Sequence, residues 1–166
     1  MSFEFILKHK PENSYYKNET MQKKYIIDGN NLIGKISELW KLQQKEKQLS
    51  RVKLARKLDQ YFSDKKVEVS LHFDGFQGDA IPTAKLRIYY SNNSLADSKI
   101  KKEIDNSKNP KLITVVSSDY SVMQYAKVSS CTVIKSEEFA KELKKTKKQN
   151  SEEEILKTID NDEIKK

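Results

Sequence analysis

The chain has 166 residues, of which 36% are hydrophobic and 34% are charged, and its formal net charge is +8. This length holds one domain with a sizeable core and excludes two ordinary domains. The basic balance favours an anionic partner such as nucleic acid, although a lysine-rich background would give the same charge. The single cysteine, Cys131, excludes a disulfide framework or a disulfide-linked partner.

The two ends of the chain differ from its centre. Residues 1–22 show no sustained apolar period and predict a flexible extension, because their apolar run at 3–7 is too short for a signal peptide core. Residues 147–166 carry many charges and few apolar anchors, which predicts a charged tail or a marginal helix. We therefore expect one domain at residues 23–146, no membrane contact and a cytoplasmic location.

Between these ends, short apolar runs alternate with segments of helical period. In chain order we first expect a strand at 25–27, a helix over 32–42, a helix over 50–62 capped by Ser50, and strands at Val67–Phe73 and Leu86–Tyr90. We then expect a helix opened by Ser94, a strand at 111–116, a helix over 120–126, a strand at 131–134 and a closing helix capped by Ser136. Strands that alternate with helices indicate an α/β fold with a mostly parallel sheet. In such sheets, ligands bind outside the carboxyl ends of the strands.

Three of the expected strands run into the same residue type. Asp28, Asp74 and Asp119 each follow an apolar strand, so parallel neighbours would bring their carboxylates to one edge of the sheet. A single aspartate after a strand is common, because aspartate suits turns and helix caps. The repetition favours a shared site.

Asp97 is a fourth candidate. It stands where a capping box would place an acid at a helix start, yet it also shares a helix face with Ile100 and Ile104. An acid on the buried side of a first turn needs a partner, and a metal ion is one such partner.

A bound cation would make this concentration of acids tolerable. Two carboxylates about 4 Å apart repel by roughly 4 kcal/mol at an effective dielectric near 20. Mg²⁺ and Mn²⁺ prefer oxygen ligands and can activate a bound water for attack on a phosphodiester. Zinc fits less well, because the only histidines, His9 and His72, are not in a ligand-spaced pair. Asn31 and Ser118 lie beside the acids and could support them, although both also fit ordinary capping and turn chemistry.

The motifs that carry these acids resemble the YacP-like branch of the NYN domain family, which belongs to the PIN-like nucleases. The matching runs, in order over residues 23–145, are Asp28-Gly29-Asn30-Asn31, Phe73-Asp74, Ile88-Tyr89-Tyr90-Ser91, Ala96-Asp97 and Ser117-Ser118-Asp119. Two departures are Asn30, where an aromatic residue is usual, and a short segment at 75–85.

The resemblance implies a PIN-like three-layer α/β/α sandwich and a metal-dependent endoribonuclease that uses Mg²⁺ or Mn²⁺. It places Asp28, Asp74, Asp97 and Asp119 on the catalytic positions, with Asp28, Asp97 and Asp119 as metal ligands. It also places Asn31 on the asparagine of the opening motif. Some relatives act on messenger RNA at the ribosome, which makes single-stranded mRNA and the ribosome expected partners.

Basic residues are concentrated around the expected site. Residues 35–66 hold ten Lys or Arg against four Asp or Glu, and residues 85–111 hold seven against three. This excess suits contact with a phosphate backbone. The expected RNA-binding residues are Lys35, Arg51, Lys53, Arg56, Lys85 and Arg87.

Two other functions compete with this hypothesis. A non-catalytic module that binds RNA or the ribosome would explain the positive charge but not the four acids. A phosphatase or nucleotide binder is disfavoured, because the chain lacks the G-x-x-x-x-G-K-[ST] and G-x-G-x-x-G phosphate-binding motifs.

Overall fold

The computed structural model describes residues 21–163, without the side chains of residues 147 and 154–163. All but the last two residues of the expected extension at 1–22 therefore lie outside the described residues. Within the described part, no helix is both long enough and apolar enough to cross a membrane.

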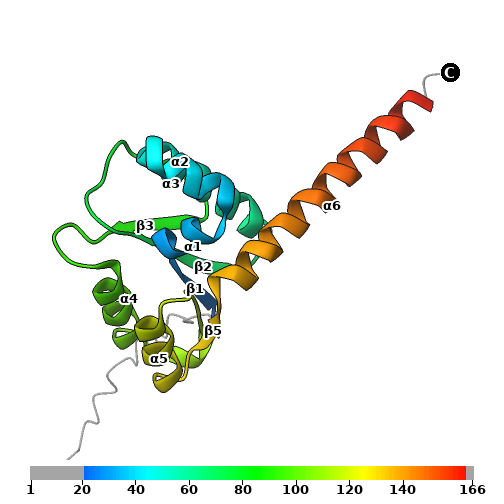
Figure 1. Ribbon diagram of the computed structural model, residues 1–166. Coiled ribbons are helices and arrows are strands. Elements are labelled where there is room, and N and C mark those ends of the chain that lie inside the picture. Colours follow the sequence, from blue (N-terminus) through cyan, green and yellow to red (C-terminus); the bar gives the residue numbers. More distant parts are fainter. Residues whose placement is uncertain (1–20, 164–166) are drawn as a thin grey trace, which may run out of the picture.

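A parallel sheet forms the centre of the molecule (Figure 1). Its strands are β1 Lys23–Asp28, β2 Val67–Phe73, β3 Leu86–Tyr90, β4 Ile113–Val116 and β5 Thr132–Ile134. The strand order is β3-β2-β1-β4-β5, and every neighbouring pair is parallel. Along the chain, β2 and β3 lie on one side of β1, and β4 and β5 lie on its other side. The strand order therefore reverses between β1 and β4.

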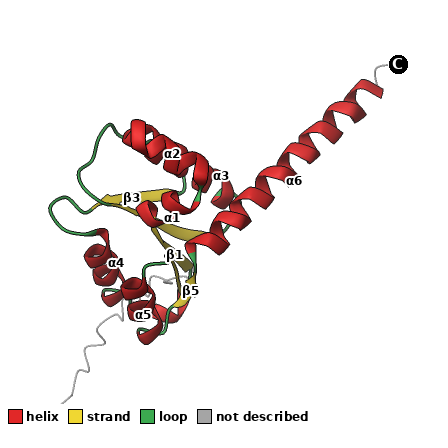
Figure 2. Ribbon diagram, viewed as in Figure 1, coloured by secondary structure: helices red, strands yellow, loops and turns green. Residues whose placement is uncertain are grey.

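Helices cover both faces of this sheet (Figure 2). One layer contains α1 Gly29–Lys35, α2 Ser37–Lys45, α3 Lys47–Phe62 and the start of α6 Ser136–Glu163, and the other contains α4 Ala96–Asp105 and α5 Tyr120–Val128. Successive strand residues point to opposite faces, so Ile27 packs in the core under α1–α3 while Ile26 packs in the core under α4 and α5. The α/β class and the three-layer arrangement are confirmed.

The strand predictions at Val67–Phe73 and Leu86–Tyr90 match the structure, whereas the other expected strands and several expected helices have different bounds. The expected helix over 32–42 is interrupted at Ile36, whose backbone is extended (φ −111°, ψ 101°) and whose side chain is buried in the core. Ser50 lies inside α3 rather than at its start, and its hydroxyl donates to the carbonyl of Leu39 at 2.9 Å.

The helix expected to open at Ser94 begins at Ala96 instead. The expected tail is also helical, because α6 continues from Ser136 to Glu163 without a break at residue 146, and its outer part projects away from the sheet (Figure 1).

The connection from β2 to β3 fixes the position of Asp74. Residues 74–85 form an irregular loop against α3. The guanidinium of Arg51 donates to the carbonyls of Asp74, at 2.5 Å, and Phe76, at 3.0 Å. Farther along, the carboxylate of Asp59 accepts hydrogen bonds from the backbone N–H groups of Ala84 and Lys85. The loop is thereby held at both ends.

Candidate active site

Asp28 occupies the centre of the candidate site. It is the last residue of β1 and the N-cap of α1, and only 8% of its surface is exposed. Its Oδ1 accepts the backbone N–H of Asn31 at 3.3 Å, and its Oδ2 accepts the hydroxyl of Ser117 at 3.0 Å. The carboxylate therefore has a fixed orientation at the point where the strand order reverses, which is where parallel α/β sheets bind ligands.

The other two strand-end acids lie close enough to perturb Asp28. Burial is the largest influence and raises the pKa of Asp28, while the hydrogen bonds from Ser117 and Asn31 lower it. The charges of Asp74 and Asp119 raise this pKa further. The structure thus brings together three carboxylates from the ends of neighbouring strands β2, β1 and β4.

Asp74 is hydrogen-bonded to the start of α4, which lies 22 residues later in the sequence. Its Oδ1 accepts the backbone N–H of Ala96 at 2.8 Å, and its own N–H donates to the side-chain oxygen of Asn30 at 2.9 Å. Asn30, which departs from the aromatic residue expected in the family, therefore connects α1 to the Asp74 loop.

Asp119 caps α5. Its Oδ1 accepts the N–H of Val122 at 3.0 Å, and its own N–H donates to the hydroxyl of Ser117 at 3.1 Å. Ser117 thus contacts both Asp28 and Asp119, and its side chain is fully buried. The sequence interpretation missed Ser117. Only the register of β1 and β4 reveals it, because Ile27 pairs with Val116 and the residues that follow these two are Asp28 and Ser117.

Asn31 and Ser118 connect the site to the start of α6. The side-chain oxygen of Asn31 accepts the N–H of Ser118 at 2.8 Å and the hydroxyl of Ser136 at 2.7 Å. The hydroxyl of Ser118 accepts the N–H of Ser136 at 2.9 Å and donates to the carboxylate of Glu137.

Glu137 is a further acid beside the site that the sequence interpretation missed. The hydrogen bond from Ser118 and the ion pair with Lys35, 2.9 Å away, lower the pKa of Glu137 to about 2. Glu137 follows the end of β5 by three residues, as Asp119 follows the end of β4, so the strand-end rule could have located it if it had not been applied to aspartates alone.

Asp97 is placed differently from the other three acids. It lies in the first turn of α4, and its Oδ1 is 2.9 Å from the ammonium of Lys101. This oxygen is buried, and the ammonium approaches it outside hydrogen-bond geometry. The capping box expected at this helix start does not form, because Leu95 is the N-cap and the cap is supplied by Asp74. The charge of Asp97 is not among the influences on the pKa of Asp28.

The expected RNA-binding residues fall into two groups. Lys35, Lys53, Arg56, Lys85 and Arg87 are exposed or half-buried. Lys53 lies 3.8 Å from Glu38, a weak surface pair. Arg51 differs, because it is 4% exposed and its guanidinium carbon lies 5.3 Å from the ring centroids of both Phe73 and Tyr90 while it holds the Asp74 loop. This position gives Arg51 a structural contact and leaves little surface for a phosphate.

Comparison with known proteins agrees with this architecture. The family model of the YacP-like NYN domain matches residues 25–166, which extends beyond the expected 23–145 into the C-terminal helix. The crystal structure of Rae1 (YacP) from Bacillus subtilis has a TM-score of 0.69 and 23% sequence identity, and the alignment covers 84% of this chain and 83% of that one. The crystal structure of a tryptophan-to-leucine mutant of the same protein gives the same TM-score and identity, with 84% and 85% covered. A comparison with curated protein sequences finds no significant match.

The structural match shows an α/β fold shared with Rae1 (YacP), which is consistent with a PIN-like fold, and the family points to a nuclease-like function related to RNA. Because the family match spans most of the chain and includes the segments that carry Asp28, Asp74, Asp97 and Asp119, this protein belongs to the YacP-like NYN domain family.

Proposed function

We propose that this protein is a metal-dependent endoribonuclease that hydrolyses phosphodiester bonds in single-stranded RNA in the cytoplasm, with messenger RNA at the ribosome as its substrate context. The observation that carries the proposal is the convergence of Asp74 and Asp119 on Asp28: the charges of both act on Asp28, and the three acids follow three adjacent parallel strands. A protein that only binds RNA has no use for negative charge at the place where phosphates would lie.

The donor atoms of the site fit a hydrated divalent cation. Among the hydrogen bonds of residues 21–163, none reaches Oδ2 of Asp74 or Oδ2 of Asp119. Within the same residues, no three His, Cys, Asp or Glu side chains are arranged to hold one ion together. Mg²⁺ commonly uses one or two carboxylates and keeps several waters, so direct binding by three acids is not required. Asp28 with Asp119 or Asp74 would hold Mg²⁺ or Mn²⁺.

A bound cation would supply an activated water and offset the charge that develops on the phosphoryl oxygens. The chain's own residues do the positioning. Ser117 and the N–H of Asn31 hold both oxygens of Asp28 in place, and Ser117 also fixes the backbone of Asp119. The buried Oδ1 of Asp97, which lacks a hydrogen bond, keeps this acid in the proposal as a further ligand.

Exposed basic residues would bind the RNA backbone on either side of these acids. Lys35, Lys53, Arg56, Lys85 and Arg87 keep this role in the proposal. Arg51 instead positions the Asp74 loop.

Asparagine substitutions test the proposal without removing helix caps. Asp28→Asn, Asp74→Asn, Asp97→Asn and Asp119→Asn each keep a side-chain oxygen that can accept a hydrogen bond but remove the negative charge. With 5′-labelled single-stranded RNA and saturating Mn²⁺, we expect the cleavage rate of the Asp28 and Asp119 variants to fall at least about 100-fold. The Asp97 variant decides whether the acid on α4 acts with the others.

Asp59→Asn is the matched control. Asp59 also accepts two backbone N–H groups, but it holds the far end of the 74–85 loop on α3, so its variant should cleave at the wild-type rate. Wild-type rates in both Asp28→Asn and Asp119→Asn would overturn the proposal. RNA binding that survives EDTA, with no product at any metal concentration, would assign the non-catalytic binding function instead.

A further inference from the structure

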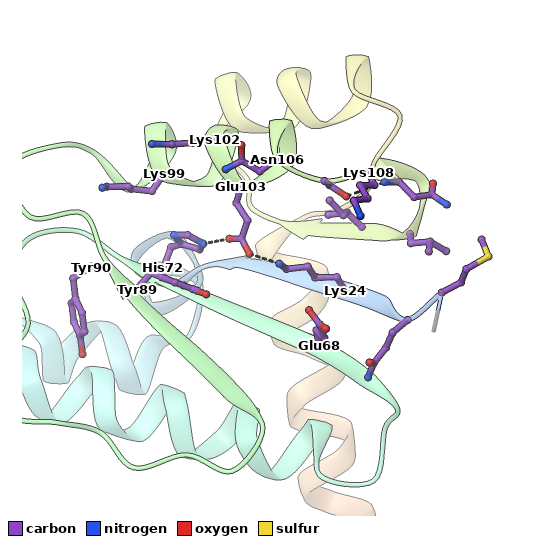
Figure 3. Close-up of a pocket in the computed structure, with 16 residues that line it drawn as sticks. Lys24, Glu68, His72, Tyr89, Tyr90, Lys99, Lys102, Glu103, Asn106 and Lys108 are labelled. Atoms are coloured by element: carbon purple, nitrogen blue, oxygen red, sulfur yellow. Dashed lines mark hydrogen bonds and ion pairs between the residues drawn. The ribbon is translucent and has the colours of Figure 1, made fainter. Parts of the chain in front are cut away.

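A pocket of about 610 Å³ lies on the side of the sheet that α4 covers (Figure 3). It is lined by residues of β1, β2, β3 and α4 and of the segment from Asn106 to Ile113, and it lies outside the group of strand-end acids. The helix α4 packs against β1 and β2, whereas Tyr89 on the edge strand β3 stays 40% exposed. The volume of the pocket is typical of pockets that bind small organic ligands.

The floor of this pocket is a buried polar network in which every charge is paired. One oxygen of Glu103 lies 2.5 Å from Nε2 of His72, and the other accepts the hydroxyl of Ser70 at 2.6 Å and contacts the ammonium of Lys24 at 2.6 Å. Burial alone would raise the pKa of Glu103, but these three partners outweigh it and hold that pKa at about 2. These contacts hold the side chains of the floor in place. The positive charge of Lys24 also compensates the negative charge of Glu103, which would otherwise repel an anionic ligand.

Tyr89 presents an aromatic surface at the edge of the pocket. Its ring stacks on the imidazole of His72, with centroids 5.1 Å apart and planes 20° apart, and His72 itself is 3% exposed. The tyrosine ring is thus supported from one side and open to solvent on the other. An exposed, fixed aromatic ring suits stacking of a nucleobase.

The opposite edge of the pocket is positive. Lys99 and Lys102 project from α4 and are exposed, and neither takes part in an ion pair among residues 21–163 (Figure 3). Four lysines and two glutamates line the pocket in total. A phosphate beside a stacked base would therefore meet positive charge.

We propose that this pocket binds a nucleotide of single-stranded RNA, with the base stacked on Tyr89 and the adjoining phosphate held by Lys99 and Lys102. The inference rests on the proposed function in taking RNA as the substrate. His72 pairs with Asp28 in the register of β2 and β1, and Lys99 lies two residues after Asp97. In the proposed arrangement, one strand of RNA would occupy the pocket while the next phosphodiester reaches the acids.

Binding measured in EDTA tests this pocket separately from cleavage. The full chain is titrated into a short fluorescein-labelled single-stranded RNA, and anisotropy gives the Kd. Tyr89→Ala should weaken binding about tenfold, while Tyr89→Phe, which keeps the ring, should retain the wild-type Kd. The double variant Lys99→Ala/Lys102→Ala should lower the slope of log K against log salt by about 0.7 for each phosphate that these lysines neutralise.

Matched controls lie on α2, which covers the other face of the sheet. Trp40→Ala removes an exposed aromatic ring, and Lys41→Ala/Lys45→Ala removes two exposed lysines. Both should leave the Kd and the salt slope unchanged.

The outcomes separate this inference from the proposed function. A wild-type Kd in Tyr89→Ala, together with lost cleavage in Asp28→Asn, overturns the pocket and leaves the nuclease. Binding that depends on Tyr89 in a protein that never cleaves RNA supports the pocket and overturns the nuclease. Displacement of the RNA by an acidic peptide but not by a mononucleotide would assign the pocket to a protein partner and overturn the inference.

Discussion

The hydroxyl of Ser117 donates to Oδ2 of Asp28 across 89 residues of sequence, at 3.0 Å. The same hydroxyl accepts the N–H of Asp119 at 3.1 Å. This contact exists because β1 and β4 are parallel neighbours with Ile27 opposite Val116, which sets the next residue of each strand side by side. One buried side chain therefore fixes the relative position of two of the candidate catalytic acids.

Ser117→Ala should weaken both the fold and the site. It leaves the N–H of Asp119 and one oxygen of Asp28 without their buried partner, so we expect a loss of about 1–3 kcal/mol in the free energy of unfolding, measured by urea denaturation. Because the hydrogen bond from Ser117 normally lowers the pKa of Asp28, that pKa should rise, and RNA cleavage near neutral pH should fall. Ser98→Ala, at an exposed position on α4, is the control; equal stability in the two variants would contradict the role given to Ser117.

Gly29→Ala should destabilise the protein by about 2 kcal/mol or more. A Cβ at this position would lie 2.6 Å from the ring of Phe73 and 2.7 Å from the carbonyl oxygen of His72. The ring could shift but the backbone carbonyl could not, so α1 would have to move away from β2. The expected signs are a lower Tm and weaker RNA cleavage, because α1 carries Asn31 and is capped by Asp28.

Gly34→Ala gives the opposite expectation in the same helix. A Cβ at Gly34 has open space around it, with nothing within 4 Å. Replacing a helical glycine by alanine commonly stabilises by up to about 1 kcal/mol, so its Tm should match or exceed that of the wild type. If the two glycine variants shift the Tm equally, the close approach at Gly29 is not what requires glycine there.

Glu103 should contribute a stability that disappears in acid. Its pKa is about 2 in the folded protein and near 4.5 in the unfolded chain, so its contribution is complete above about pH 4.5 and is lost as the pH falls toward 2. The shift corresponds to about 3 kcal/mol. The difference in unfolding free energy between wild type and Glu103→Gln should therefore shrink between pH 5 and pH 2. A difference that stays constant over this range would show that the ionised carboxylate is not responsible.

Divalent metal should raise the Tm of the wild-type protein. Ligand linkage gives roughly 2.7 kcal/mol at a hundred times the Kd of Mn²⁺, or about 5–10 °C for a chain of this size. Asp119→Asn keeps the cap of α5 and removes one charge beside Asp28, so without metal it should be at least as stable as the wild type, whereas the shift caused by Mn²⁺ should largely disappear. An equal Mn²⁺ shift in wild type and variant would remove Asp119 from the metal site.

Much of the fold could be read from local pattern. Apolar runs of strand type gave the bounds of β2 and β3. The end of β2 is buried on both faces of the sheet, whereas less and more exposed residues alternate along the edge strand β3. Boundaries failed where a tertiary contact outweighed local preference. Ile36 leaves the helix to enter the core, and the hydroxyl of Ser50 bonds to the carbonyl of Leu39 instead of capping α3.

The sequence by itself determined the alternation of strands and helices and the aspartates that follow three of the strands, because these features depend on residues that are close together in the sequence. Only the tertiary structure decided that β1 lies between β2 and β4, and hence that Asp28 lies between Asp74 and Asp119. It also decided that Arg51, one of the ten basic residues between positions 35 and 66, is buried beneath the Asp74 loop. The physical reason is that hydrogen bonds and charge interactions depend on distance in space, and strand order sets that distance independently of separation along the chain.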